Sequence, residues 1–233
     1  MDGYIALYSA VAMLLAGRYF KHRRLLDLMS AMSCLALISN VKNEGILIAL
    51  IGMLSIAITG ALSNKLKLIE LKKYFSISRL GWLAIIIAPC ILWSVFYKYK
   101  WGLTNDLKIG TTESFLQIIN RFSDGATFPL IIGRTIFHDE SAVLLALIVF
   151  IAALVLMVVS KKYTVSWIPA FITAILYYCG MITIYLLTPH DINWHISTSV
   201  SRTMLTFSNC MLAGTFFILK EVEDASSEGK YKK

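Results

Sequence analysis

The sequence predicts an all-α integral membrane protein, because three observations agree. Hydrophobic residues make up 58% of the 233 residues and charged residues only 15%, whereas soluble domains average about 45–50% and about 25%. The mean hydropathy is +0.70. Long uncharged apolar runs recur along the chain, and cations gather in alternate segments between those runs. A soluble enzyme, a disordered chain and a collagen-like chain are excluded by this composition.

About seven transmembrane helices are expected, since a membrane-spanning helix needs about 20 mostly apolar residues. The longer apolar runs cover residues 45–64, 80–97, 141–160, 163–189 and 203–219, and two shorter runs cover residues 3–17 and 28–41. We do not expect the first run to be a signal peptide. Asp2 stands where such a peptide carries basic residues, and the basic cluster follows the apolar run instead.

The positions of the cations predict the direction of the chain. Most of the 22 Lys and Arg residues follow the first, third, fifth and seventh runs: Arg18, Lys21, Arg23, Arg24, Lys65, Lys67, Lys72, Lys73, Arg79, Lys161, Lys162, Lys220, Lys230, Lys232 and Lys233. Cytoplasmic loops are enriched in such residues. We therefore expect a multi-pass protein of the cell's inner (plasma) membrane, with the N-terminus outside and the C-terminus in the cytoplasm.

The same positions argue against nucleic acid as a partner. The cations stand directly beside the expected spans, where anionic lipid head groups attract them, so membrane lipid is the expected partner. The polytopic domain is expected to cover residues 1–219. Residues 220–233 combine charge, Ser and Gly without apolar periodicity, and we expect them to form a disordered cytoplasmic tail.

One long segment, residues 98–140, is expected on the outer face. Within it Phe115, Ile118, Ile119 and Phe122 have the spacing of one apolar helix face. This spacing predicts a helix that begins near Thr112 and lies in the membrane interface. A second apolar stretch covers residues 128–137. These interfacial helices either cap the bundle or contact substrate.

Polar side chains of the expected outer loops are the candidate site. Asp2 precedes the first span, and Lys42 and Glu44 stand in the short turn between the second and third spans. That turn has two interpretations. It is either a solvated turn whose glycine permits tight geometry, or a functional site, since ionisable groups at membrane depth are functional candidates.

Residues 188–202, before the last span, hold the other candidates. If this segment is helical from residue 193, His195, Ser199 and Arg202 share a face, and a cation beside hydroxyls suits a phosphate group. A divalent metal on His190, Asp191 and His195 is the alternative. The chain contains no dinucleotide-binding glycine motif, P-loop, zinc-protease motif or nucleophile elbow.

The stretches at residues 41–45 and 188–202, with Asp2-Gly-Tyr-Ile-Ala-Leu-Tyr at the start, resemble the bacterial GT-C membrane glycosyltransferases. These are the relatives of protein mannosyltransferases and lipid A aminoarabinose transferases. The resemblance covers nearly the whole chain, although Gly-Tyr replaces the Ile-Pro of the family's Ala-Asp-Ile-Pro-Leu element. It implies transfer of a sugar from a polyprenyl-phosphate carrier to a lipid or protein acceptor on the outer face. By this resemblance Asp2 is the catalytic candidate. The candidates for substrate and lipid-phosphate binding are Lys42, Glu44, Asp191, His195 and Arg202.

The family's principal catalytic acid lies in an outer loop before the element that Asp2 matches. The chain therefore resembles the C-terminal half of such an enzyme, as a truncated or split product, and a separate N-terminal half or a homo-oligomer is an expected partner. A non-catalytic membrane protein or subunit that retains a lipid-carrier-binding shell is the alternative. A transporter is a third reading, which the lack of an internal sequence repeat disfavours.

Overall fold

The computed structural model describes residues 1–64, 88, 92, 96, 99–102, 112–138 and 142–231. Within these residues every regular element is a helix. The helices are α1 (Asp2–His22), α2 (Leu25–Ile38), α3 (Asn43–Asn64), α6 (Thr112–Ser123), α7 (Thr127–Phe137), α8 (Val143–Val159), α9 (Ile168–Leu187) and α10 (Ile192–Tyr231).

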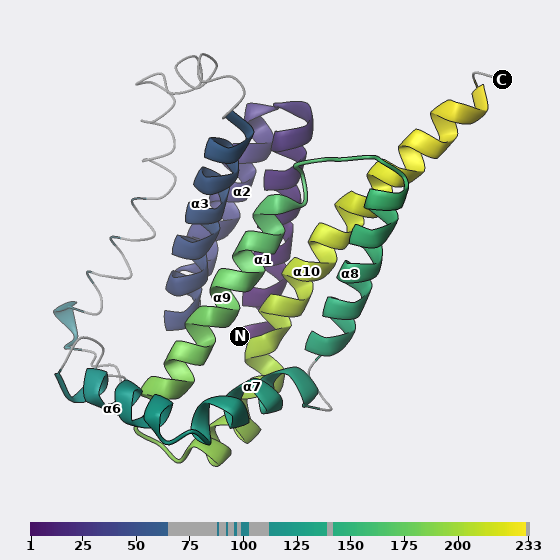
Figure 1. Cartoon of the computed structure of the whole chain (residues 1–233). Helices are drawn as coiled ribbons and strands as arrows, with labels where there is room; N and C mark the ends of the chain where they lie inside the picture. The colour runs from purple at the N-terminus through teal and green to yellow at the C-terminus, as the bar shows by residue number, and fades with distance from the viewer. Residues whose placement is uncertain are drawn as a thin grey trace.

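Six of these helices run alongside one another as a bundle, and α6 and α7 lie across one end of it (Figure 1). The N-terminus and the α2–α3 and α9–α10 connections lie at this end, which we call the α6/α7 end. The α1–α2 turn, the α8–α9 connection and the C-terminus lie at the opposite end. Segments expected on opposite sides of the membrane are therefore separated by the length of the bundle.

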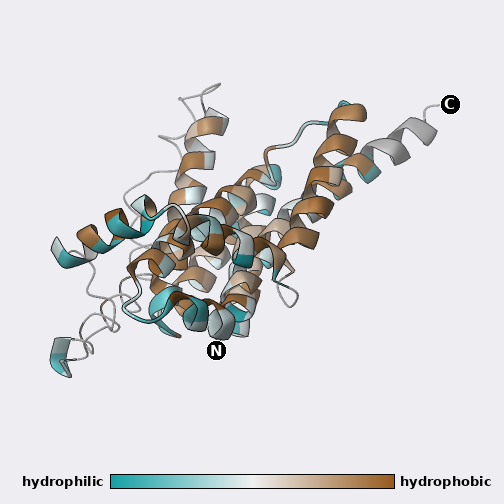
Figure 2. Ribbon diagram, turned by 60° about the horizontal axis from the view of Figure 1, so that its bottom comes forward, coloured by the Kyte–Doolittle hydropathy of each residue, from teal (hydrophilic) through white to brown (hydrophobic). Residues whose placement is uncertain are grey.

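Among the residues that the structure describes, four helices are long and apolar enough to cross a membrane: α1, residues 43–63 of α3, α9, and residues 192–224 of α10. The shorter apolar helices are α2, α7 and α8. The 14 residues of α2 extend about 21 Å at the rise of an α-helix, less than the roughly 30 Å of a hydrocarbon core. The expected span at 80–97 lies outside the described residues apart from positions 88, 92 and 96. Hydrophobic residues dominate the bundle helices, whereas hydrophilic residues gather at helix ends and on α6 (Figure 2).

Small buried side chains let the helices of the bundle pack closely. Ala12, Ala16, Ala31, Ala170 and Ala174 are fully buried, as is typical of contacts between membrane helices. Gly17 of α1 packs so tightly that a β-carbon there would overlap the ring of Phe217 on α10. Large apolar residues of α8, by contrast, are exposed: Leu145, Ile148, Ile151, Val155 and Val159. A lateral surface of this kind suits lipid as the surrounding solvent.

Two helix boundaries differ from the sequence-based expectation. The last span, expected at 203–219, is part of a helix that begins at Ile192 and continues through Tyr231. Residues 220–231, for which we expected no regular structure, are thus helical. Lys220 forms ion pairs with Glu223 and Asp224 one turn along the helix, and Lys21 of α1 lies 2.7 Å from Glu221. Pairs of opposite charge three or four residues apart, such as those of Lys220, stabilise helices.

Candidate functional site

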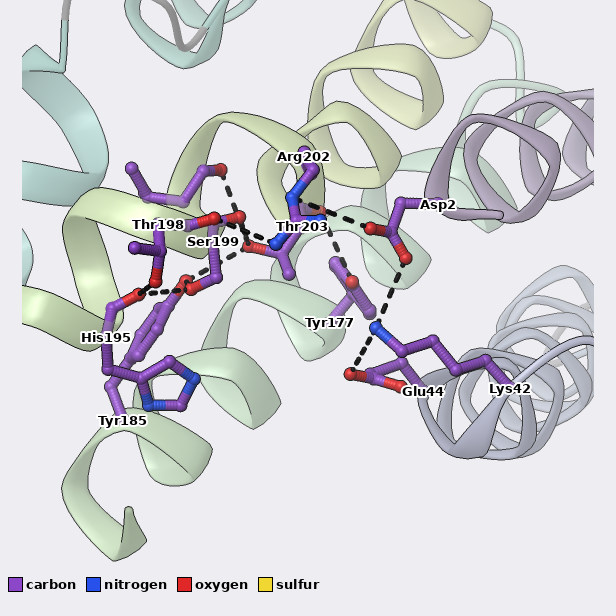
Figure 3. A network of polar contacts seen from close by, with 11 residues as sticks. Asp2, Lys42, Glu44, Tyr177, Tyr185, His195, Thr198, Ser199, Arg202 and Thr203 are labelled. Carbon is purple, nitrogen blue, oxygen red and sulfur yellow. Dashed lines mark hydrogen bonds and ion pairs between the residues drawn. The ribbon is translucent and has the colours of Figure 1, made fainter. Parts of the chain in front are cut away.

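Four charged side chains meet at the α6/α7 end of the bundle, and we call them the charge cluster: Asp2, Lys42, Glu44 and Arg202 (Figure 3). Lys42 Nζ lies 3.3 Å from Asp2 Oδ1 and 3.1 Å from Glu44 Oε1. Arg202 Nε lies 3.9 Å from Asp2 Oδ2. The structure therefore brings together four of the six residues that the sequence singled out.

The α2–α3 turn places two members of the cluster. Residues 39–42 connect the helices, and the Gly45 amide donates to the Lys42 carbonyl at 3.0 Å. A β-carbon at Gly45 would overlap the Ile38 carbonyl oxygen. The glycine is therefore required by the close approach of the two helices, as expected for a tight turn. Glu44 falls in the first turn of α3 and Asp2 in the first turn of α1, where the helix dipole favours a carboxylate.

The cluster balances two carboxylates against two cations. Burial alone would lower the pKa of Lys42, but a hydrogen bond to Glu44 and the charges of Glu44 and Asp2 hold it above its ordinary value. Lys42 is therefore a firmly charged ammonium at neutral pH. Arg202 is 62% exposed, and its guanidinium also donates to the Thr198 carbonyl at 2.8 Å.

A small open pocket adjoins the cluster, lined by Asp2, Ile5, Glu44, Tyr177, Arg202, Thr203 and Thr206. Its volume of about 10 Å³ is close to that of one water-sized sphere. The enclosed part of the pocket therefore has room for about one water molecule while the ion pairs are closed.

Near the cluster, two tyrosines of α9 form a network of hydroxyl groups with α10, and Tyr177 also lines the pocket. Tyr185 Oη lies 3.0 Å from both Ser199 Oγ and Thr203 Oγ1 of α10, and Tyr177 donates to the Thr203 carbonyl at 3.2 Å. Sequence reasoning missed both tyrosines. Their eight-residue spacing, which places them on one helix face, was the available signal, because a buried Tyr usually finds a partner for its hydroxyl.

His195 and Asp191 stand apart from the charge cluster. His195 shares a face of α10 with Ser199, whose hydroxyl donates to the His195 carbonyl at 2.6 Å. Its ring packs edge-on against Tyr185 at 5.2 Å between centroids, and its Nδ1 is buried without a hydrogen-bond partner in the described structure. The Asp191 carboxylate accepts the Trp194 amide at 2.9 Å, which is the geometry of an N-cap and explains why α10 begins at Ile192.

The metal alternative finds no support in the part of the chain that the structure describes. There, no three His, Cys, Asp or Glu side chains come close enough to hold a metal ion. The rings of His190 and His195 lie 6.2 Å apart between centroids, and Asp191 caps its helix. The three residues considered for a metal therefore do not form one site.

Comparisons with protein-family models, with curated proteins and with solved structures gave no match to this chain.

Proposed function

We propose that this chain is a membrane glycosyltransferase of the GT-C type, or the C-terminal part of one. It transfers a sugar from a polyprenyl-phosphate carrier to a lipid or protein acceptor on the outer face of the membrane. The observation that carries the proposal is the charge cluster, in which two cations and two carboxylates from α1, the α2–α3 turn, α3 and α10 meet at one end of an apolar bundle.

The cluster contains the groups that this reaction needs. An acceptor hydroxyl oxygen attacks the anomeric carbon, the bond from that carbon to the phosphate oxygen breaks, and the phosphate leaves with the bonding electrons. A carboxylate takes the hydroxyl proton, and Asp2 is the candidate for that role within this chain. Lys42 and Arg202 would hold the negative charge that develops on the leaving phosphate.

Binding of the carrier would exchange ion pairs. Both cations are engaged by carboxylates in this structure, and the enclosed part of the adjoining pocket has room for about one water molecule. A phosphate that attracts Lys42 and Arg202 would release Asp2 from both. The carrier would thus free the proposed base at the moment when it is needed.

The distribution of cations between the two ends of the bundle supports the proposed orientation. Arg18, Lys21 and Lys220 lie toward the end opposite α6 and α7, and cytoplasmic loops favour cations. We propose seven spans, with the charge cluster outside and the C-terminus in the cytoplasm. A carrier that spans one leaflet would then place its phosphate beside Lys42 and Arg202.

A second candidate function is that of a non-catalytic subunit. It is favoured by the observation that every charged side chain of the cluster is paired with an opposite charge. A non-catalytic subunit would keep the shell that binds the carrier phosphate and leave the transfer to another chain. In that case the cluster would bind a polyprenyl phosphate but would not transfer a sugar.

A transfer assay separates these two functions. Purified protein in liposomes is supplied with a radiolabelled polyprenyl-phosphate sugar and a membrane extract as acceptor. If the chain is the enzyme, we expect label in lipid or protein. We expect this label to be lost in the variants Asp2→Asn and Lys42→Ala. Absence of transfer together with specific carrier binding would assign the chain to the non-catalytic role. Absence of both would overturn the proposal.

A further inference from the structure

Helix α6 is amphipathic, and its polar side is the one attached to the bundle. Gln117 Nε2 donates to the Thr188 carbonyl at 2.7 Å, and Arg121 donates to the Tyr185 and Leu186 carbonyls at 3.1 Å each. Gln117 and Arg121 are four residues apart and therefore share one face of α6. In a water-soluble protein the apolar face would make this contact.

The carbonyls that α6 contacts belong to the end of α9. The last four carbonyl groups of a helix lack partners within that helix, and α9 ends at Leu187. A cation at this position also complements the negative end of the helix dipole. Gln117 and Arg121 therefore clamp α6 to α9 through groups that need a hydrogen-bond donor.

The opposite face of α6 is apolar and exposed. Phe115, Leu116, Ile119 and Phe122 are between 43 and 64% exposed, whereas Ile118, at the border of the two faces, packs against the core. The helix lies across the end of the bundle (Figure 1), next to helices that also expose large apolar residues along their sides. The apolar face of α6 thus adds to the exposed apolar surface of the described helices, which suits contact with lipid.

We propose that α6 lies in the outer membrane interface, with Phe115, Leu116, Ile119 and Phe122 among the acyl chains and with Gln117 and Arg121 clamping the end of α9. The occupant of the exposed face is membrane lipid. The clamp also holds the turn of α9 that carries Tyr185, whose hydroxyl contacts Ser199 and Thr203.

Two adjacent positions of α6 test the proposal. The cysteines of the chain are first replaced by serine or alanine, and Ile119→Cys and Asn120→Cys are then spin-labelled separately. Both residues are exposed, and Asn120 lies about 100° further around the helix than Ile119, on the side toward Gln117. In liposomes of phosphatidylethanolamine and phosphatidylglycerol, we expect the label at 119 to collide several times more often with oxygen than with a water-soluble nickel chelate. The label at 120 should show the reverse preference.

Each other outcome contradicts the proposal in its own way. Preference for the nickel chelate at both positions would place α6 in water. Shielding of position 119 from both reagents would mean that protein, such as a second copy of this chain, covers the face.

The clamp is tested by Arg121→Ala, which should speed hydrogen exchange of residues 112–123, with Arg134→Ala on α7 as the control. If hydrogen exchange of residues 112–123 is unchanged in Arg121→Ala, Arg121 does not clamp α6 to α9.

Discussion

The Lys42 ammonium lies 3.3 Å from the Asp2 carboxylate, although 40 residues separate the two in sequence. The same nitrogen lies 3.1 Å from Glu44, so one cation joins the starts of α1 and α3. An anionic ligand must compete with both carboxylates for Lys42.

Removal of one competing carboxylate should tighten phosphate binding. We expect Asp2→Asn to bind a polyprenyl phosphate about two- to fivefold more tightly, because a partly exposed ion pair contributes about 0.5–1 kcal/mol. The same variant should lose sugar transfer. Affinity is measured in lipid nanodiscs, and Glu113→Gln, an exposed carboxylate on α6, is the control. Weaker binding by Asp2→Asn would show that Asp2 supports the phosphate and does not compete for the cations.

The raised pKa of Lys42 predicts how the cluster responds to pH. A pKa above the ordinary 10.5 means that the ion pairs of Lys42 contribute fully to stability below pH 10.5, and that this contribution is lost as pH rises through the higher folded-state value. Carrier affinity should consequently show no titration of Lys42 between about pH 7 and 9. A loss of affinity in this range that Lys42→Arg abolishes would contradict the prediction.

We expect a side chain at position 45 to destabilise the protein, because the neighbouring backbone leaves no room for a β-carbon. Gly45→Ala places a methyl group against the Ile38 carbonyl oxygen, which should lower the free energy of unfolding by about 1–3 kcal/mol. Gly60, in the same helix, has open space around its β-carbon position. Gly60→Ala should therefore be neutral or stabilising. Thermal unfolding in detergent compares the two, and equal stability of both variants would refute the close approach of α2 and α3.

The expectation for Asp191 separates helix capping from carrier binding. Asp191→Ala should destabilise the protein by about 1 kcal/mol through the loss of the Trp194 amide contact, while carrier affinity stays unchanged. Asp191→Asn should retain most of the stability. If carrier affinity falls in Asp191→Ala while thermal stability does not, the residue contacts the carrier after all.

Much of the helical framework could be predicted because the information is local. The apolar spacing of Phe115, Ile118 and Phe122 predicted a helix from Thr112, and the structure has α6 over Thr112–Ser123. The second apolar stretch, residues 128–137, forms α7 over Thr127–Phe137. The helical state of residues 220–231 was not predicted, since it accompanies an ion pair between Lys21 and Glu221, which lie at opposite ends of the chain.

The candidate site was predictable as a region but not as a set of contacts. The alternation of spans placed Asp2, Lys42, Glu44 and Arg202 at one end of the bundle. Which of them touch depends on the rotation of each helix about its axis, which packing decides. The same holds for Tyr177 and Tyr185, which belong to an apolar run in the sequence and become polar partners only because α10 presents Ser199 and Thr203 to them.

The most direct test of the charge cluster as a site for the carrier phosphate is the affinity for a polyprenyl phosphate in nanodiscs. We predict that Lys42→Ala and Arg202→Ala each weaken binding about tenfold or more, since a charge-assisted contact contributes about 1.5–3 kcal/mol. Lys42→Arg should retain most of the affinity, and Arg24→Ala, which removes an exposed cation at the opposite end, should bind normally. Unchanged affinity in Lys42→Ala and Arg202→Ala, with both proteins folded, would contradict the account.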